Sequence, residues 1–210
     1  MARIVIIGGG GHAKVIISIL KKLKKYEIIG YTDKYDNGLI LGVPYLGNDG
    51  MLGKIHNDSG VQNAAVGIGQ IKNTAVRRSI VDILLKIGFY MPAIVSPDSI
   101  VNEDVYVSDG SVVMDGAIIN SGTIIGTYSI INTGVSLDHD CQIGNFVHIA
   151  PGCVLSGGTK VEDDTMIGTG ASIIHNCRLG RNCIIGAGAV VIQDCIEPGV
   201  YAGNPATKKS

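Results

Sequence analysis

The chain has 210 residues, of which 46% are hydrophobic, and a formal net charge of −1 at pH 7. A charge so close to zero gives no reason to expect nucleic acid or an anionic membrane surface as a partner. The largely apolar stretch 3–7 ends at a glycine run, so it is too short for the core of a signal peptide or a membrane span. We therefore expect a cytoplasmic protein with no membrane partner.

The first ninety residues alternate between strand and helix patterns. Apolar runs predict strands at 4–7, 27–32 and 64–68, and apolar residues at helical spacing predict helices at 12–25 and 73–86. This βαβαβ order predicts a small parallel sheet, like half of a Rossmann fold, in a first domain of residues 1–91.

A glycine-rich turn joins the first strand to the first helix. The segment 8–13 formally satisfies the pattern G-x-G-x-x-A, but a dinucleotide fold needs a second half, and a repeat begins where that half would be. The glycines instead let a phosphate approach the backbone N–H groups of Gly10 and Gly11 at a helix N-terminus. His12 is placed to donate to that phosphate, and Asp33 to accept from a sugar or base hydroxyl. The alternatives are a tight turn without a ligand, a surface histidine and a turn aspartate.

A repeat of six residues runs from 95 to 196. Each block begins with an aliphatic residue, and the fifth place holds nothing larger than valine. The first places are Val95, Val101, Val107, Val113, Ile119, Ile125, Ile131, Leu137, Ile143, Ile149, Leu155, Val161, Ile167, Ile173, Leu179, Ile185 and Val191. A period of six fits neither an α-helix nor a lone strand, so the chain must coil back on itself as a triangular parallel β-helix of about five to six turns.

In this coil the aliphatic residue points inward and the small residue lies near a corner. Glycine or asparagine supplies backbone freedom for the bends, at Gly110, Gly116, Gly122, Gly144, Gly168, Gly180, Asn182 and Gly186. All five cysteines fall in the small fifth place, so packing explains them better than disulfides or zinc. Pro92 and Pro97 mark the junction, which gives a β-helix domain of 92–196 and a tail of 197–210.

One block of the repeat carries a candidate catalytic group. His139 occupies an outward corner, where a histidine with an oriented ring is a suitable general base. Asp138 and Asp140 flank it, and spacing alone leaves open which of them orients the ring. His148 lies nine residues on, which we interpret as a neighbouring part of the same face; there it contacts either a ligand or an adjacent subunit. A metal held by His139 and His148 lacks a third histidine in register, so we expect no metal.

Gly157 follows His139 by one turn, or 18 residues. Its backbone N–H is placed to stabilise the carbonyl oxygen of a thioester as charge develops there. The alternative is a simple corner glycine.

The hexad run, together with five local motifs, resembles a known family. The motifs are Gly10-Gly11-His12, the segment 29–33, the segment 67–69, His139-Asp140 and the segment 203–206. They resemble the hexapeptide-repeat acetyltransferases of bacteria that act on nucleotide-linked 4-amino-sugars or on sialic acids. This resemblance implies that the prism is a left-handed β-helix.

The resemblance also implies a function and a set of residues. Acetyl-CoA would lie in a groove between the prisms of a homotrimer, and the small domain would hold a nucleotide-sugar. His139 would be the base and Asp140 its partner, although many relatives have glutamate there. The remaining positions that the resemblance assigns are His148, Gly157, Thr169, Ala187 and Gly188 for acetyl-CoA, and Gly10, Gly11, His12, Asp33 and Gly69 for the nucleotide-sugar.

We therefore expect N-acetylation of the 4-amino group of a UDP-linked or similar deoxy-amino-sugar in bacterial surface-glycan biosynthesis. The alternatives are O-acetylation of a sialic-acid-type sugar and a binding protein without catalysis. The sequence does not identify the nucleotide base or the sugar of the substrate.

Overall fold

The computed structural model describes residues 1–70 and 74–209. The chain divides into two compact units, one of Met1–Gln70 with Ala75–Ser96 and one that contains Pro97 and everything after it. The first unit thus runs to Ser96, slightly beyond residue 91. No helix in the described parts of the chain is long and apolar enough to cross a membrane.

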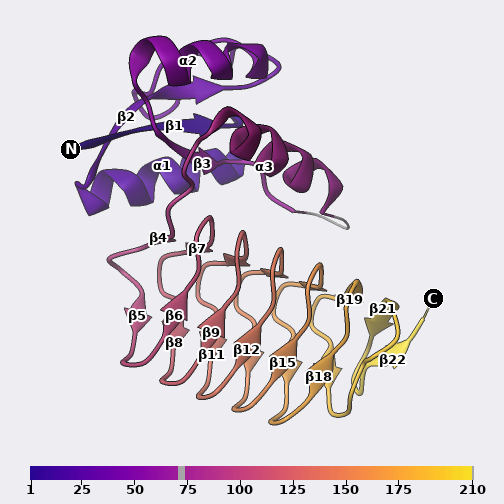
Figure 1. The fold of residues 1–210 in the computed structure, drawn as a ribbon. Coiled ribbons are helices and arrows are strands. Elements are labelled where there is room, and N and C mark those ends of the chain that lie inside the picture. Colours follow the sequence, from indigo (N-terminus) through magenta and orange to yellow (C-terminus); the bar gives the residue numbers. More distant parts are fainter. Residues whose placement is uncertain (71–73, 210) are drawn as a thin grey trace. The chain divides into compact units, whose positions relative to one another are not determined.

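The first unit is a small parallel sheet with helices, as predicted (Figure 1). Its elements are β1 (Ala2–Ile7), α1 (Gly11–Leu23), β2 (Tyr26–Thr32), the short 3₁₀ helix η1 (Asp49–Met51), α2 (Leu52–Ser59), β3 (Asn63–Val66), α3 (Ala75–Ile87) and β4 (Ile94–Val95). The three strands of the sheet are parallel in the order β2-β1-β3. The sequence did not predict α2, because only Leu52 and Ile55 of its eight residues are buried, too few for a recognisable period.

The two predicted helices are present with shifted ends. Helix α1 stops at Leu23 because Lys24 adopts a left-handed conformation (φ 53°) and donates its N–H to Leu20 O. The buried side of α1 consists of Ala13, Ile16, Ile17, Ile19 and Leu20. Helix α3 begins at Ala75, and the start predicted at residue 73 lies outside the described residues.

The second unit is a parallel β-solenoid of about six turns, consistent with a left-handed β-helix (Figure 1). Its strands are β5 (Ile100–Val101), β6 (Tyr106–Val107), β7 (Val112–Val113), β8 (Ile118–Ile119), β9 (Ile124–Ile125), β10 (Ile130–Ile131), β11 (Ser136–Leu137), β12 (Gln142–Ile143), β13 (His148–Ile149), β14 (Val154–Leu155), β15 (Lys160–Val161), β16 (Met166–Ile167), β17 (Ser172–Ile173), β18 (Arg178–Leu179), β19 (Cys183–Ile185), β20 (Val190–Val191), β21 (Gly199–Ala202) and β22 (Thr207–Lys208).

These strands form three faces. Face A contains β7, β10, β13, β16, β19, β21 and β22; face B contains β5, β8, β11, β14, β17 and β20; face C contains β6, β9, β12, β15 and β18. Paired residues on a face are 18 apart, as in Ile131↔Ile149. Within the described part of the tail, residues 197–209, β21 extends face A, β22 pairs antiparallel with β21, and Lys208 forms an ion pair with Glu197.

The core of the solenoid confirms the hexad prediction. From Val113 to Val191 every first-place aliphatic residue is at most 3% exposed. All five cysteines are free and buried. In the first turn of the solenoid the first-place residue is not buried, since Val101 is 37% exposed.

The bends depart from the prediction in one respect. The fourth place of every block from Asp104 to Gly188 has a positive φ, so Gly110, Gly116, Gly122 and Asn182 supply backbone freedom there. The second-place glycines Gly144, Gly168, Gly180 and Gly186 have no positive φ. They are small because a neighbouring turn approaches them: a Cβ on Gly144 would lie 2.6 Å from Asp163 Oδ1.

Candidate active site

His139 lies at the corner between faces B and C, in the turn from β11 to β12. Its side chain is 65% exposed, and its Nδ1 lies 2.8 Å from Asp140 Oδ2. Asp140 occupies the fourth place of the block, with φ 59°. Its carboxylate lies over the preceding turn, where Gly122 leaves room: a Cβ there would be 2.5 Å from Asp140 Oδ1.

The tautomer of His139 follows from this contact. An ionised carboxylate only accepts hydrogen bonds, so Nδ1 carries the proton and Nε2 presents a lone pair. The hydrogen bond that Asp140 accepts from the ring, and secondly the charge of Asp138, raise the pKa of His139 above its ordinary value. No side chain or backbone group in the described chain is hydrogen-bonded to Nε2. The ring is therefore arranged as a general base.

Gly157 packs directly beneath this ring. A Cβ on Gly157 would lie 2.5 Å from His139 Nε2 and 2.6 Å from Cε1, although the backbone there has no positive φ. Glycine is thus required for space rather than for conformation. Within the described chain Gly157 N–H has no acceptor, whereas Gly158 N–H donates to His139 O at 2.9 Å. The proposed base and the proposed oxyanion donor lie together.

The structure corrects the placement of His148. This residue lies on β13 of face A, whereas His139 lies at the corner of faces B and C. The faces change every six residues, so nine residues carry the chain away from the His139 corner. His148 is buried, and its Nε2 lies 3.2 Å from Asn132 Nδ2. Within one chain it is not a neighbour of His139.

The residues that the resemblance assigned to the CoA groove lie at another edge. Thr169, Ala187 and Gly188 occupy turns between faces A and B. They are stacked on one another, since Gly188 N–H donates to Thr169 O at 2.8 Å. Face B therefore separates this edge from the edge that carries His139.

The glycine-rich turn of the first unit combines two kinds of glycine. A Cβ on Gly9 would lie 2.8 Å from Tyr31 and from Asn37, so that position is crowded. Gly10 and Gly11 meet nothing within 4 Å and have no positive φ. Neither crowding nor backbone conformation calls for glycine at these two places. Gly10 is the N-cap of α1 and no side chain caps that helix end, which leaves the N–H groups of Gly10 and Gly11 open to an anion.

Asp33 braces this turn. Its Oδ2 accepts the Gly9 N–H at 2.6 Å, and its Oδ1 accepts the Tyr35 N–H at 3.2 Å. Gly69 lies next to His12, because a Cβ on Gly69 would be 3.8 Å from His12 Cβ. The predicted residues of the small domain thus gather around the N-terminal end of α1.

Lys14 is a candidate that the sequence analysis missed. It lines a hollow of about 360 Å³ with Gly9, Asn37, Leu39, Ile40 and Leu41. Its position in the first turn of α1 puts a cation beside the open helix end. A lysine two residues after the Gly-Gly-His turn was the only signal in the sequence.

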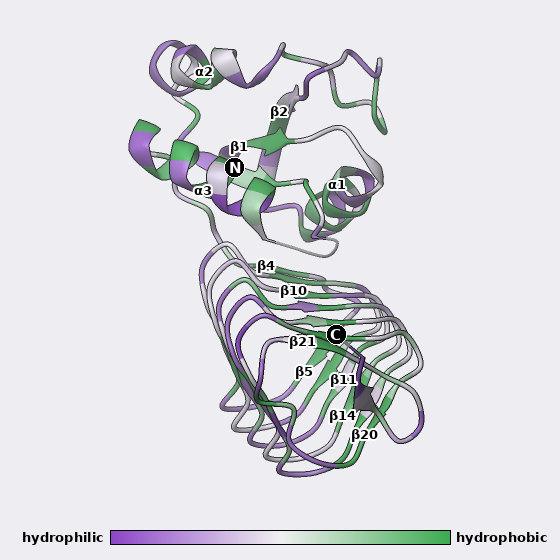
Figure 2. Ribbon diagram, turned by 90° about the vertical axis from the view of Figure 1, so that its right-hand side faces the viewer, coloured by the Kyte–Doolittle hydropathy of each residue, from purple (hydrophilic) through white to green (hydrophobic). Residues whose placement is uncertain are grey.

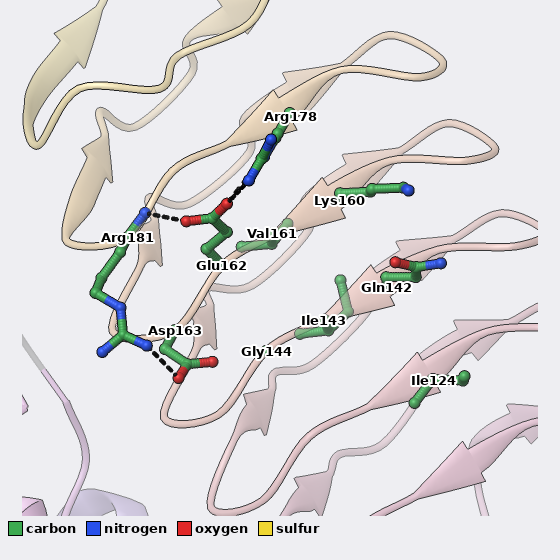
Figure 3. Close-up of a pocket in the computed structure, with 10 residues that line it drawn as sticks. All are labelled: Ile124, Gln142, Ile143, Gly144, Lys160, Val161, Glu162, Asp163, Arg178 and Arg181. Carbon is green, nitrogen blue, oxygen red and sulfur yellow. Dashed lines mark hydrogen bonds and ion pairs between the residues drawn. The ribbon is translucent and has the colours of Figure 1, made fainter.

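A second hollow, of about 580 Å³, lies on face C and is lined by none of the predicted catalytic or binding residues (Figure 3). Four of its five charged side chains are paired with one another: Glu162 accepts hydrogen bonds from the Arg178 side chain and from Arg181 N, and Arg181 donates to Asp163 Oδ2 at 2.8 Å. We interpret this network as a brace for the corner rather than as a ligand site.

No cluster of three or more His, Cys, Asp or Glu side chains in the described residues is arranged to hold a metal ion. The chemistry available at the His139 corner is that of a base, a carboxylate and a backbone N–H.

Two family models match the chain. Residues 3–84 match the PglD N-terminal domain, and residues 158–193 match the bacterial transferase hexapeptide repeat. The GDP-perosamine N-acetyltransferase PerB of Caulobacter crescentus, solved with CoA and GDP-perosamine, is 33% identical over 100% of this chain and 98% of its own, with a TM-score of 0.92. The chain belongs to the hexapeptide-repeat sugar acetyltransferases with a PglD-type N-terminal domain.

Two further solved structures are similar to the chain over its whole length. The acetyltransferase domain of PglB from Neisseria gonorrhoeae is 33% identical, with a TM-score of 0.91 and 100% of both chains covered. WeeI from Acinetobacter baumannii is 25% identical, with a TM-score of 0.87 and full coverage of both chains. Curated protein sequences give no match.

Proposed function

We propose that this acetyltransferase transfers the acetyl group of acetyl-CoA to the 4-amino group of a nucleotide-linked deoxy-amino-sugar, with His139 as the general base. The observation that carries the proposal is the packing of His139 on Gly157. It puts the lone pair of Nε2 next to a backbone N–H without an acceptor in the described chain, while Asp140 holds Nδ1 at 2.8 Å.

The reaction follows from these groups. The neutral amine attacks the thioester carbonyl carbon, and Gly157 N–H stabilises the oxygen as it becomes negative. His139 Nε2 takes a proton from the nitrogen of the tetrahedral adduct and passes it to the sulfur as the C–S bond breaks. Asp140 stabilises the imidazolium that forms in between. A base in this position contributes about 10²- to 10⁴-fold to the rate.

The small domain supplies the nucleotide-sugar site of this proposal. The open N-terminal end of α1 at Gly10 and Gly11 favours a phosphate, and Lys14 adds a positive charge beside it. The complex of PerB with GDP-perosamine supports a nucleotide-linked amino-sugar as the acceptor, which also favours N-acetylation over O-acetylation.

We also propose a homotrimer in which prisms pack side by side. Support comes from exposed aliphatic side chains on face B, whose strands β11, β14 and β20 carry hydrophobic colours in Figure 2. Ile100, Ile118 and Val154 share one place of the repeat, which Ser136 interrupts, and Ile174 and Ile192 lie two residues further along their turns. Exposed aliphatic side chains gathered on one face are typical of a surface that another protein chain covers. A monomeric mass by light scattering at micromolar concentration would refute the trimer.

The function is tested by thiol release from acetyl-CoA with UDP-, GDP- and dTDP-linked 4-amino-sugars, and with free and CMP-linked sialic acid. His139→Ala is the active-site variant, and His56→Phe, in the first unit, is a control that keeps an aromatic ring in its contact with Phe89. Turnover of one nucleotide-amino-sugar that is lost in His139→Ala and kept in His56→Phe supports the proposal.

Turnover with the sialic acids alone would replace it with O-acetylation. No turnover on the whole panel, or full activity of His139→Ala, would overturn it.

A further inference from the structure

A ladder of polar side chains leads along face B to the catalytic corner. Asn102, Asn120 and Asp138 occupy equivalent places in three successive turns. Asn102 Nδ2 donates to Asn120 Oδ1 at 2.8 Å, and Asn120 Nδ2 donates to Asp138 Oδ1 at 3.0 Å. Inward aliphatic residues alternate with these outward ones along the strands, so the ladder contributes nothing to the core. Its last member adjoins His139.

Asp138 also holds the backbone of His139. Its Oδ1 accepts the His139 N–H at 2.8 Å, in addition to the bond from Asn120. These two bonds, the one from the His139 backbone first, keep the pKa of Asp138 below its ordinary value. Asp138 is therefore ionised wherever an imidazole titrates. The two acids that flank His139 have different tasks: Asp140 contacts the ring, and Asp138 contacts the main chain.

We propose that Asn120 and Asp138 are positioning residues for His139, which hold its backbone so that the ring stays between Asp140 and Gly157. The proposal rests on the proposed role of His139 as the base. The positioning follows from geometry, because Asp138 is hydrogen-bonded both to the preceding turn and to the residue that carries the ring. A displacement of about 1 Å at a reacting group typically costs about 10²-fold in rate.

The charged groups beside the ring are Asp138 and Asp140, which come from its own turn. The uncharged Asn120 and Gly122 come from the turn before, and Gly157 comes from the turn after. His175 lies at the same corner two turns on. The negative charge nearest to the ring besides Asp140 is thus Asp138, which raises the pKa of His139 as the second cause after Asp140.

The variants separate position from charge. Asp138→Asn keeps an oxygen that accepts the His139 N–H but removes the charge. The rising limb of kcat against pH then moves to lower pH, and the plateau stays near that of the wild type. Asn120→Ala keeps the charge but removes one support, so the pH midpoint stays and kcat falls with unchanged KM for both substrates. Asp138→Ala removes both the charge and the hydrogen-bond acceptor for the His139 N–H, and lowers kcat by roughly 10- to 100-fold.

Asn102→Ala is the matched control, since it removes the same kind of bond one turn further from Asp138. Each variant is assayed with the nucleotide-amino-sugar that the panel identifies. The ring pKa of His139 is also measured by NMR, which needs no substrate. If Asp138→Ala does not fold, Asp138→Asn and Asn120→Ala carry the test.

A wild-type kcat in Asn120→Ala, or an equal loss in Asn102→Ala, would overturn the positioning role. An unchanged ring pKa in Asp138→Asn would overturn the contribution of the Asp138 charge to the raised pKa of His139. Failure of the proposed function is a separate result, because it appears as retained activity in His139→Ala.

Discussion

The contact between His139 and Gly157 gives the sharpest prediction, which concerns Gly157→Ala. The new methyl group would lie 2.5 Å from Nε2, whereas an ordinary contact begins at 3.4 Å, so the ring must retreat by about 0.9 Å. The ring is exposed and retreats into solvent without disturbing the core. A shift of this size at the base predicts a loss in kcat of about 10²-fold.

The same substitution should leave the fold intact. The φ of Gly157 suits any L-residue, and replacing glycine at such a place stabilises a protein by about 0.4–1 kcal/mol through the unfolded chain. The backbone N–H remains, so the oxyanion donor is preserved. We expect a large loss of kcat with an unchanged or slightly higher melting temperature.

The assay is a double-mutant cycle in thiol release with thermal unfolding beside it. In the His139→Ala background, Gly157→Ala should cause no further loss, because there is no ring to displace. Gly53→Ala is the control glycine, since a Cβ there meets nothing within 4 Å. A wild-type kcat for Gly157→Ala, or an equal loss in both backgrounds, would show that the ring contact is not what Gly157 provides.

Three further outcomes are expected. Asp140→Asn should move the rising limb of kcat to lower pH, because the hydrogen bond that Asp140 accepts from the ring is the main cause of the raised pKa of His139; a pH profile checks the sign, and a shift to higher pH would contradict it. Asp33→Ala should cost about 1–3 kcal/mol of unfolding free energy, since it releases a half-buried backbone N–H, and should raise KM for the nucleotide-sugar alone. Ile131→Ala should cost about 2–5 kcal/mol in denaturant unfolding as a core cavity, whereas the same change at the exposed Ile118 should cost far less.

The constant six-residue period of the solenoid explains why most of the fold was predictable. An inward place in a coil of constant period depends only on the residue number, so an unbroken run of hexads from 95 to 196 is enough to identify the core. The bend at the fourth place follows equally from position, even where Tyr128, Asp140 or Phe146 replaces glycine. Helix α2 was missed for the opposite reason, since a short helix with two buried residues has no period to read.

The sequence placed some of the candidate site residues correctly relative to one another and misplaced others. His139 and Gly157 were paired correctly, because a spacing of 18 residues stacks them. His148 was misplaced, because half a turn of a triangular coil reaches a different face. Lys14 was overlooked because a lone lysine near a helix start is common on protein surfaces.

The sequence by itself determined the coil, its core, the free cysteines and the histidine at an outward corner, since all of these depend on the residue number within a repeat. Only the tertiary structure decided which acid contacts the ring. Asp138 and Asp140 are equally distant from His139 along the chain. The positive φ at the fourth place turns Asp140 towards Nδ1, and the flat face B directs Asp138 towards Asn120 and the backbone. The difference between the two aspartates therefore comes from the geometry of the turn.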